Sequence, residues 1–454
     1  MHTADDPPVP LDVPARPVGA AQGVAPTSAR PARQLGLDVA RALAVLGMFL
    51  AHFGAAAADG HEGWASSVTR FVDGRAMPLF VLVSGAGVTF LLRATTRPVR
   101  RLAGRATVLL VLGLALEHTT GIAVILQFYA LYFLLALVVR RWSDHALLAA
   151  AVAVTSVGAA TRLLLIEHLP HGFQHVGSHS AQIGALRTLL RPDALLADLW
   201  FGGIYPVFPT FAFFLVGMWL GRQRLSSGRL QAGLVVGGLL LAVVGYGAGW
   251  STQSRRQLPA AVEAAYGPFA DLAVTADRNG VTIEELVEFA AVNSQESVDD
   301  FYAEMATPLG STPADLRAQV ATVSHDGHLR ELARASGWDL LDSAGHSHMP
   351  AWMVGATGWA LMVVGACLAF AGRFRRLAWP LAMAGQMALT LYVAHLLALR
   401  WPLHRWPYSL GPAAGVSIVG AGWVGVVGLC AVYRRRLAHG PLEAVLRRAG
   451  GPAG

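Results

Sequence analysis

Ionisable and aromatic side chains stand in or beside two apolar segments between Gly36 and Gly87, which a short polar loop joins. The side chains that could take part in catalysis or binding are Asp38, Arg41, His52, His61, Trp64, Asp73 and Arg75. Desolvating an ionisable residue in or beside a membrane span is costly, so such residues indicate a functional site. Histidine also titrates near neutral pH, where it can act as a general base or a nucleophile.

Structural interpretations of the same residues remain open. Asp38 and Arg41 are three residues apart, so they share one face at the mouth of the first segment and could form an ion pair that lipid tolerates. For Asp73 and Arg75 this interpretation is favoured. His61 could be a solvated loop histidine.

The composition identifies a polytopic membrane protein. Of the 454 residues, 54% are hydrophobic and only 14% are charged, with a mean hydropathy of +0.48. The net charge of +7 does not indicate a nucleic-acid partner, because every basic residue is an arginine and the arginines cluster between apolar runs. Both cysteines, Cys367 and Cys430, lie in apolar segments, which supports neither a disulfide framework nor a thiolate metal site.

The apolar runs predict an all-α bundle of about ten transmembrane helices. Residues 1–34 have the composition of a disordered tail, without an evident cleavable signal peptide, so the first run is expected to be an uncleaved signal anchor. That run begins near Leu35 and has about 20 residues, enough to cross a bilayer. The further expected spans are 76–92, 106–117 extended into a turn, 121–139, 145–166, 200–221, 231–250, 351–371, 380–400 and 411–432.

Arginine clusters predict the orientation of the bundle. They occur at every second boundary between spans, which under the positive-inside rule places both termini in the cytoplasm. His61 and Trp64 then face outward. The clusters begin at Arg30, Arg93, Arg140, Arg222, Arg373 and Arg434.

Residues 251–349 are too polar for a membrane span and predict an inserted helical module. Thr282 and Glu285 form a capping box, and Thr312 with Pro313 predicts a second helix start. The flanking spans place this module outside the cytoplasm. The expected organisation is a disordered cytoplasmic tail (1–34), an N-terminal transmembrane domain (35–250), the module (251–349), a C-terminal transmembrane segment (350–433) and a basic cytoplasmic tail (434–454).

Further polar residues lie within the expected spans. Glu117 and His118 interrupt one span, and either lines a site or makes a hydrogen bond inside the bundle. Gln127 and Tyr129 can share a helix face, where contacts between helices are the favoured role. His395 taken alone is more often a satisfied core histidine.

Two histidine clusters resemble ligand sets. His168, His171, His175 and His179 have helical spacing, but a proline and two glycines interrupt the run and no cysteine or carboxylate completes a known pattern. We therefore expect no metal site. His346 and His348 are interpreted as parts of a solvated outer loop.

The opening stretch resembles a known family. LDVARALAVLGM (37–48), HEGW (61–64) and DGRAMPLFVLVSGAG (73–87) are similar to the start of the heparan-alpha-glucosaminide N-acetyltransferase family. GQMALTLYVAHLL (385–397) and HGPLEAVLRR (439–448) resemble closing signatures of the related YeiB-like bacterial membrane family. The sequence departs from the acetyltransferases at His52, where they carry asparagine.

The resemblance implies acyl transfer across a membrane, with cytoplasmic acyl-CoA, expected to be acetyl-CoA, as co-substrate. His61 matches the histidine that the family uses, and His52 would orient the acceptor or polarise the thioester carbonyl. Arg41, beside Asp38, could meet a CoA phosphate. The same resemblance favours His395 as a site residue.

The sequence therefore predicts a multi-pass acyltransferase of the inner membrane. Its expected partners are membrane lipids and an extracytoplasmic glycan, lipid or small metabolite with a hydroxyl or amine; homodimerisation stays open. A transporter that uses the same buried ionisable residues is the first alternative, although the sequence has no evident inverted repeat. A non-catalytic scaffold whose acidic module binds a partner is the second.

Overall fold

The fold is known from a computed structural model of the chain. It describes residues 34–54, 63–120, 124–164, 200, 205–253, 283–294, 297–324, 339–343, 345–399 and 412–451. All regular elements in these ranges are helices, so the predicted all-α class is confirmed. The predictions that concern residues 1–33, including the disordered tail, lie outside the described part.

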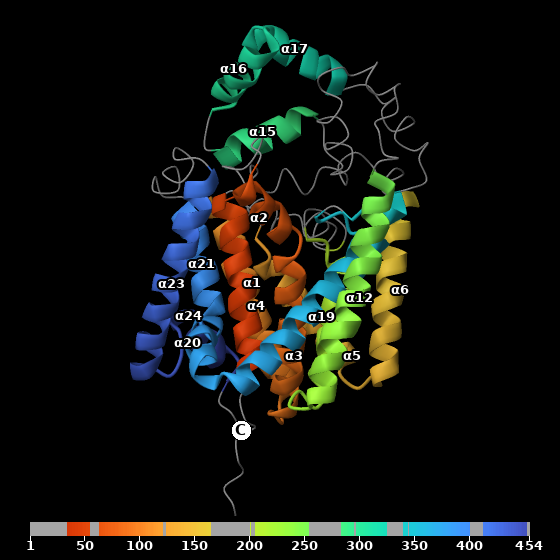
Figure 1. Cartoon of the computed structure of the whole chain (residues 1–454), viewed down its shortest axis with the longest axis vertical. Helices are drawn as coiled ribbons and strands as arrows, with labels where there is room; N and C mark the ends of the chain where they lie inside the picture. The colour runs from red at the N-terminus through yellow and green to blue at the C-terminus, as the bar shows by residue number, and fades with distance from the viewer. Residues whose placement is uncertain are drawn as a thin grey trace, which may run out of the picture. The chain divides into compact units, whose positions relative to one another are not determined.

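The N-terminal half of the chain contributes the helices drawn from red to green in Figure 1. They are α1 (Leu35–Gly54), α2 (Trp64–Val72), α3 (Ala76–Arg93), α4 (Pro98–Thr120), α5 (Leu126–Val139), α6 (Asp144–Leu164), α11 (Val207–Leu220) and α12 (Gly228–Gln253). The expected polar loop before the second span thus contains a helix, α2, that the sequence analysis did not predict.

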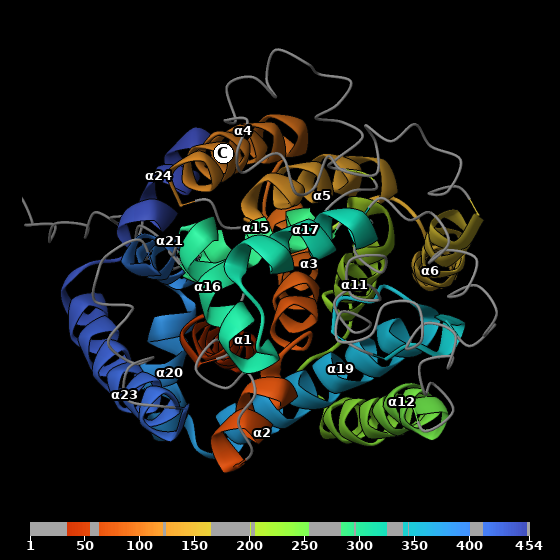
Figure 2. The same cartoon turned by 90° about the horizontal axis from the view of Figure 1, so that it is seen from above.

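The C-terminal half completes the same bundle. Its elements are the short 3₁₀ helix η3 (Asp339–Leu341), α19 (Pro350–Arg373), α20 (Arg375–Gly385), α21 (Ala388–Leu399), α23 (Pro412–Arg436) and α24 (Pro441–Ala449). Viewed from above, α1 and α3 are central and the longer helices of both halves surround them (Figure 2). Ala40 and Ala44 of α1 are completely buried, as this central position requires.

Not all ten expected spans meet a length criterion for crossing a membrane. Six helices of the described part are long and apolar enough, or seven if a bent pair counts as one span. The α5 and α11 helices are apolar but have only 14 residues each. The protein is therefore a multi-pass helical membrane protein, whereas the number ten is not established.

The span expected at 380–400 is broken. Its two parts, α20 and α21, are bent by 58° from each other. The break falls at Gln386 and Met387, after Pro380 has already removed one amide donor from α20. The side chain of Gln386 is buried and polar, so this break is a place where the bundle must supply hydrogen-bond partners.

Glycines bring α12 and α19 into close contact. A Cβ atom built on Gly245 would lie 2.2 Å from the amide nitrogen of Gly355, and one on Gly238 would lie 2.5 Å from that of Met362. Backbone approach of this kind is how small residues join helices in lipid, where burial of apolar side chains provides little driving force.

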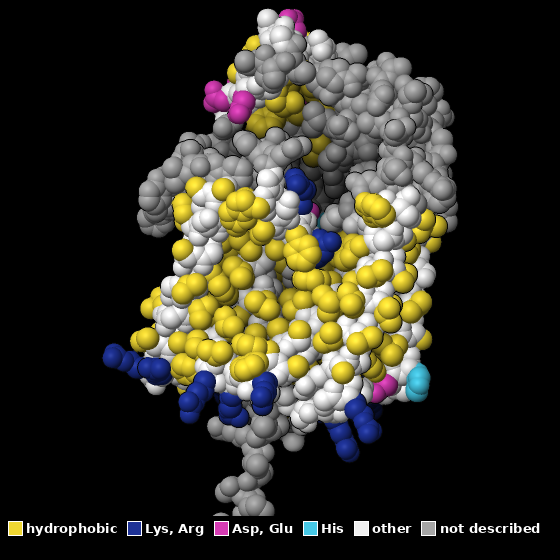
Figure 3. Space-filling view, in the orientation of Figure 1, with side chains coloured by type: hydrophobic (Ala, Val, Ile, Leu, Met, Phe, Trp, Pro, Cys, Tyr) yellow, Lys and Arg dark blue, Asp and Glu magenta, His cyan; other side chains and the backbone are white. Residues whose placement is uncertain are grey.

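Charge and hydropathy separate along the bundle (Figure 3). Arginine side chains gather at one end of an apolar band, and we call it the arginine end. Hydrogen bonds and an ion pair place Arg93, Arg140 and Arg222 together there. The ends of separate helices are joined there, since Arg222 donates to the carbonyl oxygen of Arg140 and pairs with Asp144, and Arg93 donates to the carbonyl oxygen of Gly221. The opposite end, with His52, His346 and His395, is the histidine end.

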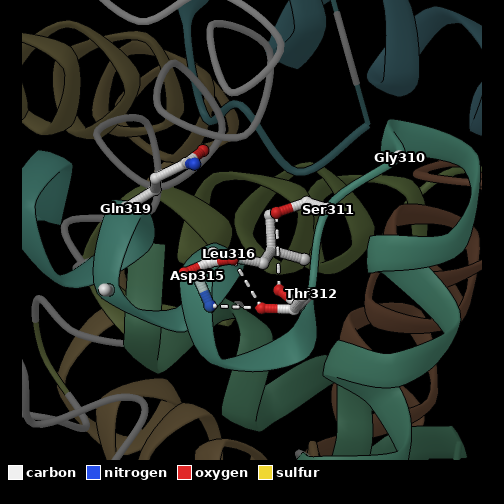
Figure 4. Close-up of a pocket in the computed structure, with 7 residues that line it drawn as sticks. Gly310, Ser311, Thr312, Asp315, Leu316 and Gln319 are labelled. Carbon is white, nitrogen blue, oxygen red and sulfur yellow. Dashed lines mark hydrogen bonds between the residues drawn. The ribbon is translucent and has the colours of Figure 1, made fainter.

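The inserted module contains α15 (Ile283–Ser294), α16 (Val298–Leu309) and α17 (Pro313–Ser324). These helices pack on one another around buried residues such as Val287, Tyr302 and Leu316. The predicted start of α17 is confirmed: the amide of Asp315 donates to the Thr312 hydroxyl, which donates to the Asp315 carboxylate (Figure 4). Thr282 of the other expected capping box lies outside the described residues.

Candidate functional site

Two histidines from opposite halves of the chain meet at the histidine end. His52 stands in the last turn of α1, and His395 lies near the end of α21. Nδ1 of His52 is 2.9 Å from Nε2 of His395, and the two rings stack with centroids 5.2 Å apart. One nitrogen must donate and the other must accept, so the pair can share one proton between its facing atoms but cannot hold one on each without repulsion.

Aromatic rings surround this histidine pair. Phe49 lies 4.9 Å from the His395 ring, and Tyr392 lies edge-on at 5.1 Å. The Tyr392 hydroxyl accepts a hydrogen bond from the backbone amide of Ile125, which fixes α21 against the start of α5. His395 is only 2% exposed, so its position is set by the packing of the bundle.

Tyrosines of α5 extend the aromatic wall. Tyr129 packs edge-on against Phe80 and against Tyr132. The Tyr132 hydroxyl hydrogen-bonds to Thr210 of α11, whereas the buried Tyr129 hydroxyl has no hydrogen-bond partner among the described residues. Tyr129 is therefore the member of this wall with a free polar atom that a ligand could use.

Glu117 and Gln127 contact each other. The Gln127 amide donates to the Glu117 carboxylate at 2.5 Å, which ties α4 to α5. Gly113 permits the approach, because a Cβ atom there would lie 2.6 Å from the Gln127 amide nitrogen of the backbone. His118, next in sequence to Glu117, is exposed and takes no part in this contact.

Asp38 and Arg41 lie at the arginine end of α1, away from His52. The Arg41 guanidinium donates to Asp38 at 2.7 Å, and the Gln386 amide at the helix break donates to the other Asp38 oxygen at 2.9 Å. Arg434 in turn donates to the Gln386 side-chain oxygen. Since an α-helix rises 1.5 Å per residue, the 14 residues from Asp38 to His52 separate the two groups by about 21 Å.

The residues of the α2–α3 region take different positions. Trp64 at the start of α2 is 57% exposed. The Arg75 guanidinium lies over the rings of Phe71 and Tyr246 and donates to the Phe71 carbonyl oxygen, so it is held by cation–π contacts rather than by Asp73. Asp73 instead faces His346, with 3.9 Å between Oδ1 and Nε2. The favoured Asp73–Arg75 ion pair does not occur.

A group of residues around His346 was not expected from the sequence. His346 and His348 are predicted to lie in a solvated outer loop, yet His348 is 2% exposed and His346 contacts the rings of Tyr205 and Trp352. Burial lowers the pKa of His346, and the Asp73 carboxylate opposes part of that shift. Burial also raises the pKa of Tyr205 to about 12, with a further contribution from Asp73. The sequence signal that could have indicated this group is Gly345, which precedes His346 and His348 at the start of a span.

Several predicted residues are outside the described part of the chain. His61 is one of them, as are His168, His171, His175 and His179. Among the residues that the structure describes, no group of three or more His, Cys, Asp or Glu side chains could hold a metal ion.

Two known protein families match segments of this chain, one in each half of the bundle. Residues 33–240 match the family described as heparan-alpha-glucosaminide N-acetyltransferase, catalytic. Residues 328–450 match the family described as protein of unknown function, DUF418. The family resemblance is confirmed. No curated protein and no solved structure matches the chain. The first matched segment holds Asp38, His52, His61 and Asp73, and the second holds His346, Gln386 and His395. The Asp38–Gln386, His52–His395 and Asp73–His346 contacts therefore each join the two segments.

Proposed function

We propose that this protein transfers an acyl group, with acetyl as the first choice, from acyl-CoA to a hydroxyl or amine on the other side of the membrane. The observation that carries the proposal is the contact between His52 and His395. It joins the segment similar to the acetyltransferase family with the second family segment, at the end of the bundle opposite the arginines.

The two ends of the bundle suit the two substrates. Positive side chains favour the cytoplasmic side, so the arginine end would face the cytoplasm and the anionic phosphates of CoA. Arg101, Arg105 and Arg447 are close enough there for their charges to interact. Arg41 keeps 24% of its side chain exposed beside Asp38. The acceptor would reach the histidine end from the outside.

The histidine pair provides the chemistry that acyl transfer requires. A neutral imidazole can remove the proton of an attacking hydroxyl or amine, or can itself attack the thioester carbonyl. His395 orients the His52 ring through their shared hydrogen bond, as a second group orients a base in other acyl-transfer sites. His61 stays the residue that the family resemblance favours for the same step.

The decisive experiment measures release of free CoA from radiolabelled acetyl-CoA by the purified protein. The variants are His52→Ala, His61→Ala and His395→Ala, with His145→Ala, an exposed histidine of α6, as the matched control. Loss of a general base or nucleophile is expected to lower the rate by about 10²-fold or more, whereas the control keeps the wild-type rate. The proposal is wrong if the wild type neither binds nor hydrolyses acetyl-CoA, or if all three histidine variants match the control.

A transporter is the second candidate, because α20 and α21 form a broken helix beside buried polar residues. Broken helices with exposed ends bind substrates in many transporters. Substrate flux into sealed vesicles without CoA would support this candidate, and a CoA-dependent reaction without flux would exclude it.

A further inference from the structure

A second acid–base group lies near the histidine pair. It consists of Asp73, from the turn between α2 and α3, and His346, from the loop 345–349 that leads into α19. The neighbouring backbone holds them in place: a Cβ atom on Gly74 would lie 2.4 Å from the Cα of Gly345, and one on Gly345 would lie 2.6 Å from an Asp73 oxygen. The turn and the loop are thus in direct backbone contact.

The loop holds its histidines in an unusual conformation. His346 and His348 have backbone φ angles of 61° and 57°, in the left-handed region that side chains with a Cβ atom rarely adopt. Such residues are strained and persist where the surroundings over-determine them, often at functional sites. A solvated loop would relax this strain, whereas the packing of Tyr205 and Trp352 against His346 maintains it.

The two ring nitrogens of His346 have different surroundings. Nε2 faces Asp73 at 3.9 Å, which favours the proton on Nε2 in the neutral ring. Nδ1 is then a lone-pair acceptor, and it is buried with no hydrogen-bond partner among the described residues. Leaving a buried polar atom unpaired costs its full desolvation penalty. A bound hydroxyl or amine would relieve this cost by donating to Nδ1.

The charges around His346 place this group beside the proposed reaction. Within the described residues, the ionisable side chains that face it are Asp73, His52 of α1, Tyr205 before α11 and His348 of its own loop. His52 is close enough for the charges of the two imidazoles to interact. A proton taken up at His346 would meet a carboxylate only on the Asp73 side.

We propose that His346, held by Asp73, is the general base that removes the proton from the acceptor during acyl transfer. The inference rests on the proposed function. In the step, the acceptor oxygen or nitrogen forms a bond to the acyl carbon, its proton passes to Nδ1 of His346, and the bond from carbon to the CoA sulfur breaks. The thiolate leaves with the electron pair and takes a proton from water, and His346 returns its proton to water.

The test compares two acceptors with labelled acetyl-CoA and the purified full-length chain. Water must lose a proton as it attacks and therefore needs the base, whereas hydroxylamine is nucleophilic at neutral pH without one. The main variant is His346→Asn, because asparagine also tolerates a left-handed backbone. His348→Asn is the matched control, since it places the same change two residues away in the same loop and conformation.

The His346→Asn variant is expected to release CoA to water about 10²-fold more slowly than wild type, and hydroxylamine is expected to restore most of the rate. The wild-type rate with water falls as the pH drops through the pKa of His346, because the protonated ring cannot accept a proton. This fall disappears in His346→Asn. In Asp73→Asn it moves to lower pH, because the carboxylate that stabilises the charged ring is gone. His348→Asn alters the same loop but leaves the pH-dependent fall of the rate in place.

Each other result contradicts a specific part of the proposal. If wild type releases no CoA to either acceptor, the proposed function itself fails. If wild type is active and His346→Asn keeps its rate and pH profile with water, the role of His346 is wrong and the proposed function stands. A loss that hydroxylamine does not restore, or that His348→Asn reproduces, assigns the loop a structural role only.

Discussion

At the scale of single residues, the first helix carries two polar groups that differ in how completely they are satisfied. Asp38 accepts from Arg41 and Gln386, and Gln386 accepts from Arg434, so the group at the arginine end is a connected network. At the other end, His52 has a histidine partner and lies near unpaired atoms such as Nδ1 of His346. The connected network suits a structural role, whereas the unpartnered Nδ1 of His346 near His52 suits ligand binding.

The Asp38–Arg41 pair is expected to stabilise the fold. The Asp38 side chain is 7% exposed, so Asp38→Asn leaves a guanidinium with an uncompensated charge in a shielded place and should lower the free energy of unfolding by about 3 kcal/mol. The matched control is Asp299→Asn in the module, which breaks an ion pair of similar length whose side chains are 52% and 79% exposed and should cost less than about 1 kcal/mol. Denaturant unfolding in detergent measures both, and equal costs would contradict this interpretation.

At the scale of elements, close backbone contacts position the helices that carry the site. The α19 helix follows directly from the loop of His346, so its packing against α12 also holds that loop. The contact depends on glycines of both helices and leaves no room for a methyl group at Gly245. A shift of α19 would move His346 relative to Asp73, which belongs to a different element.

Two glycines of α12 provide a matched comparison. Gly245→Ala forces its new methyl group against Gly355 and is expected to destabilise the protein by about 1–3 kcal/mol. Gly247→Ala, two residues further on, meets no atom within 4 Å and should be neutral or stabilising by up to about 1 kcal/mol. Thermal unfolding of both variants in the same detergent tests the difference. If the two midpoints move together, helix propensity and not the contact with α19 controls the result.

At the scale of the whole molecule, the sequence predicted the class of fold, most helix positions and the separation of Asp38 from His52. These features follow from local hydropathy, span length and arginine placement. It did not predict the contacts of His52 with His395 or of Asp73 with His346, because each joins residues hundreds of positions apart and depends on which helices pack together. The bend at Gln386 was also missed, since an apolar stretch of 20 residues looks continuous when its tertiary hydrogen bonds are not known.

The orientation of the bundle is testable by labelling single cysteines. Both native cysteines, Cys367 and Cys430, are buried, which keeps the background low. Ser67→Cys introduces a thiol at an exposed position of α2 near the histidine end, and Arg141→Cys introduces one at the arginine end. If the arginine end is cytoplasmic, a membrane-impermeant maleimide labels Ser67→Cys in intact cells and labels Arg141→Cys only after permeabilisation. The reverse pattern would invert the proposed direction of transfer.

The contacts of α1 with the last part of the bundle also constrain how the protein is made. The His395 partner of His52 is synthesised 343 residues later, and the Gln386 partner of Asp38 is synthesised 348 residues later. At about 5–20 residues per second, the ribosome needs roughly 20–70 s to supply them. During that time the first helix holds an aspartate and a histidine in the translocon or in lipid without these partners. A chain that stops before the break between α20 and α21 would make neither contact, so two polar side chains on the first helix would remain as a chemical mark that the last helices are missing.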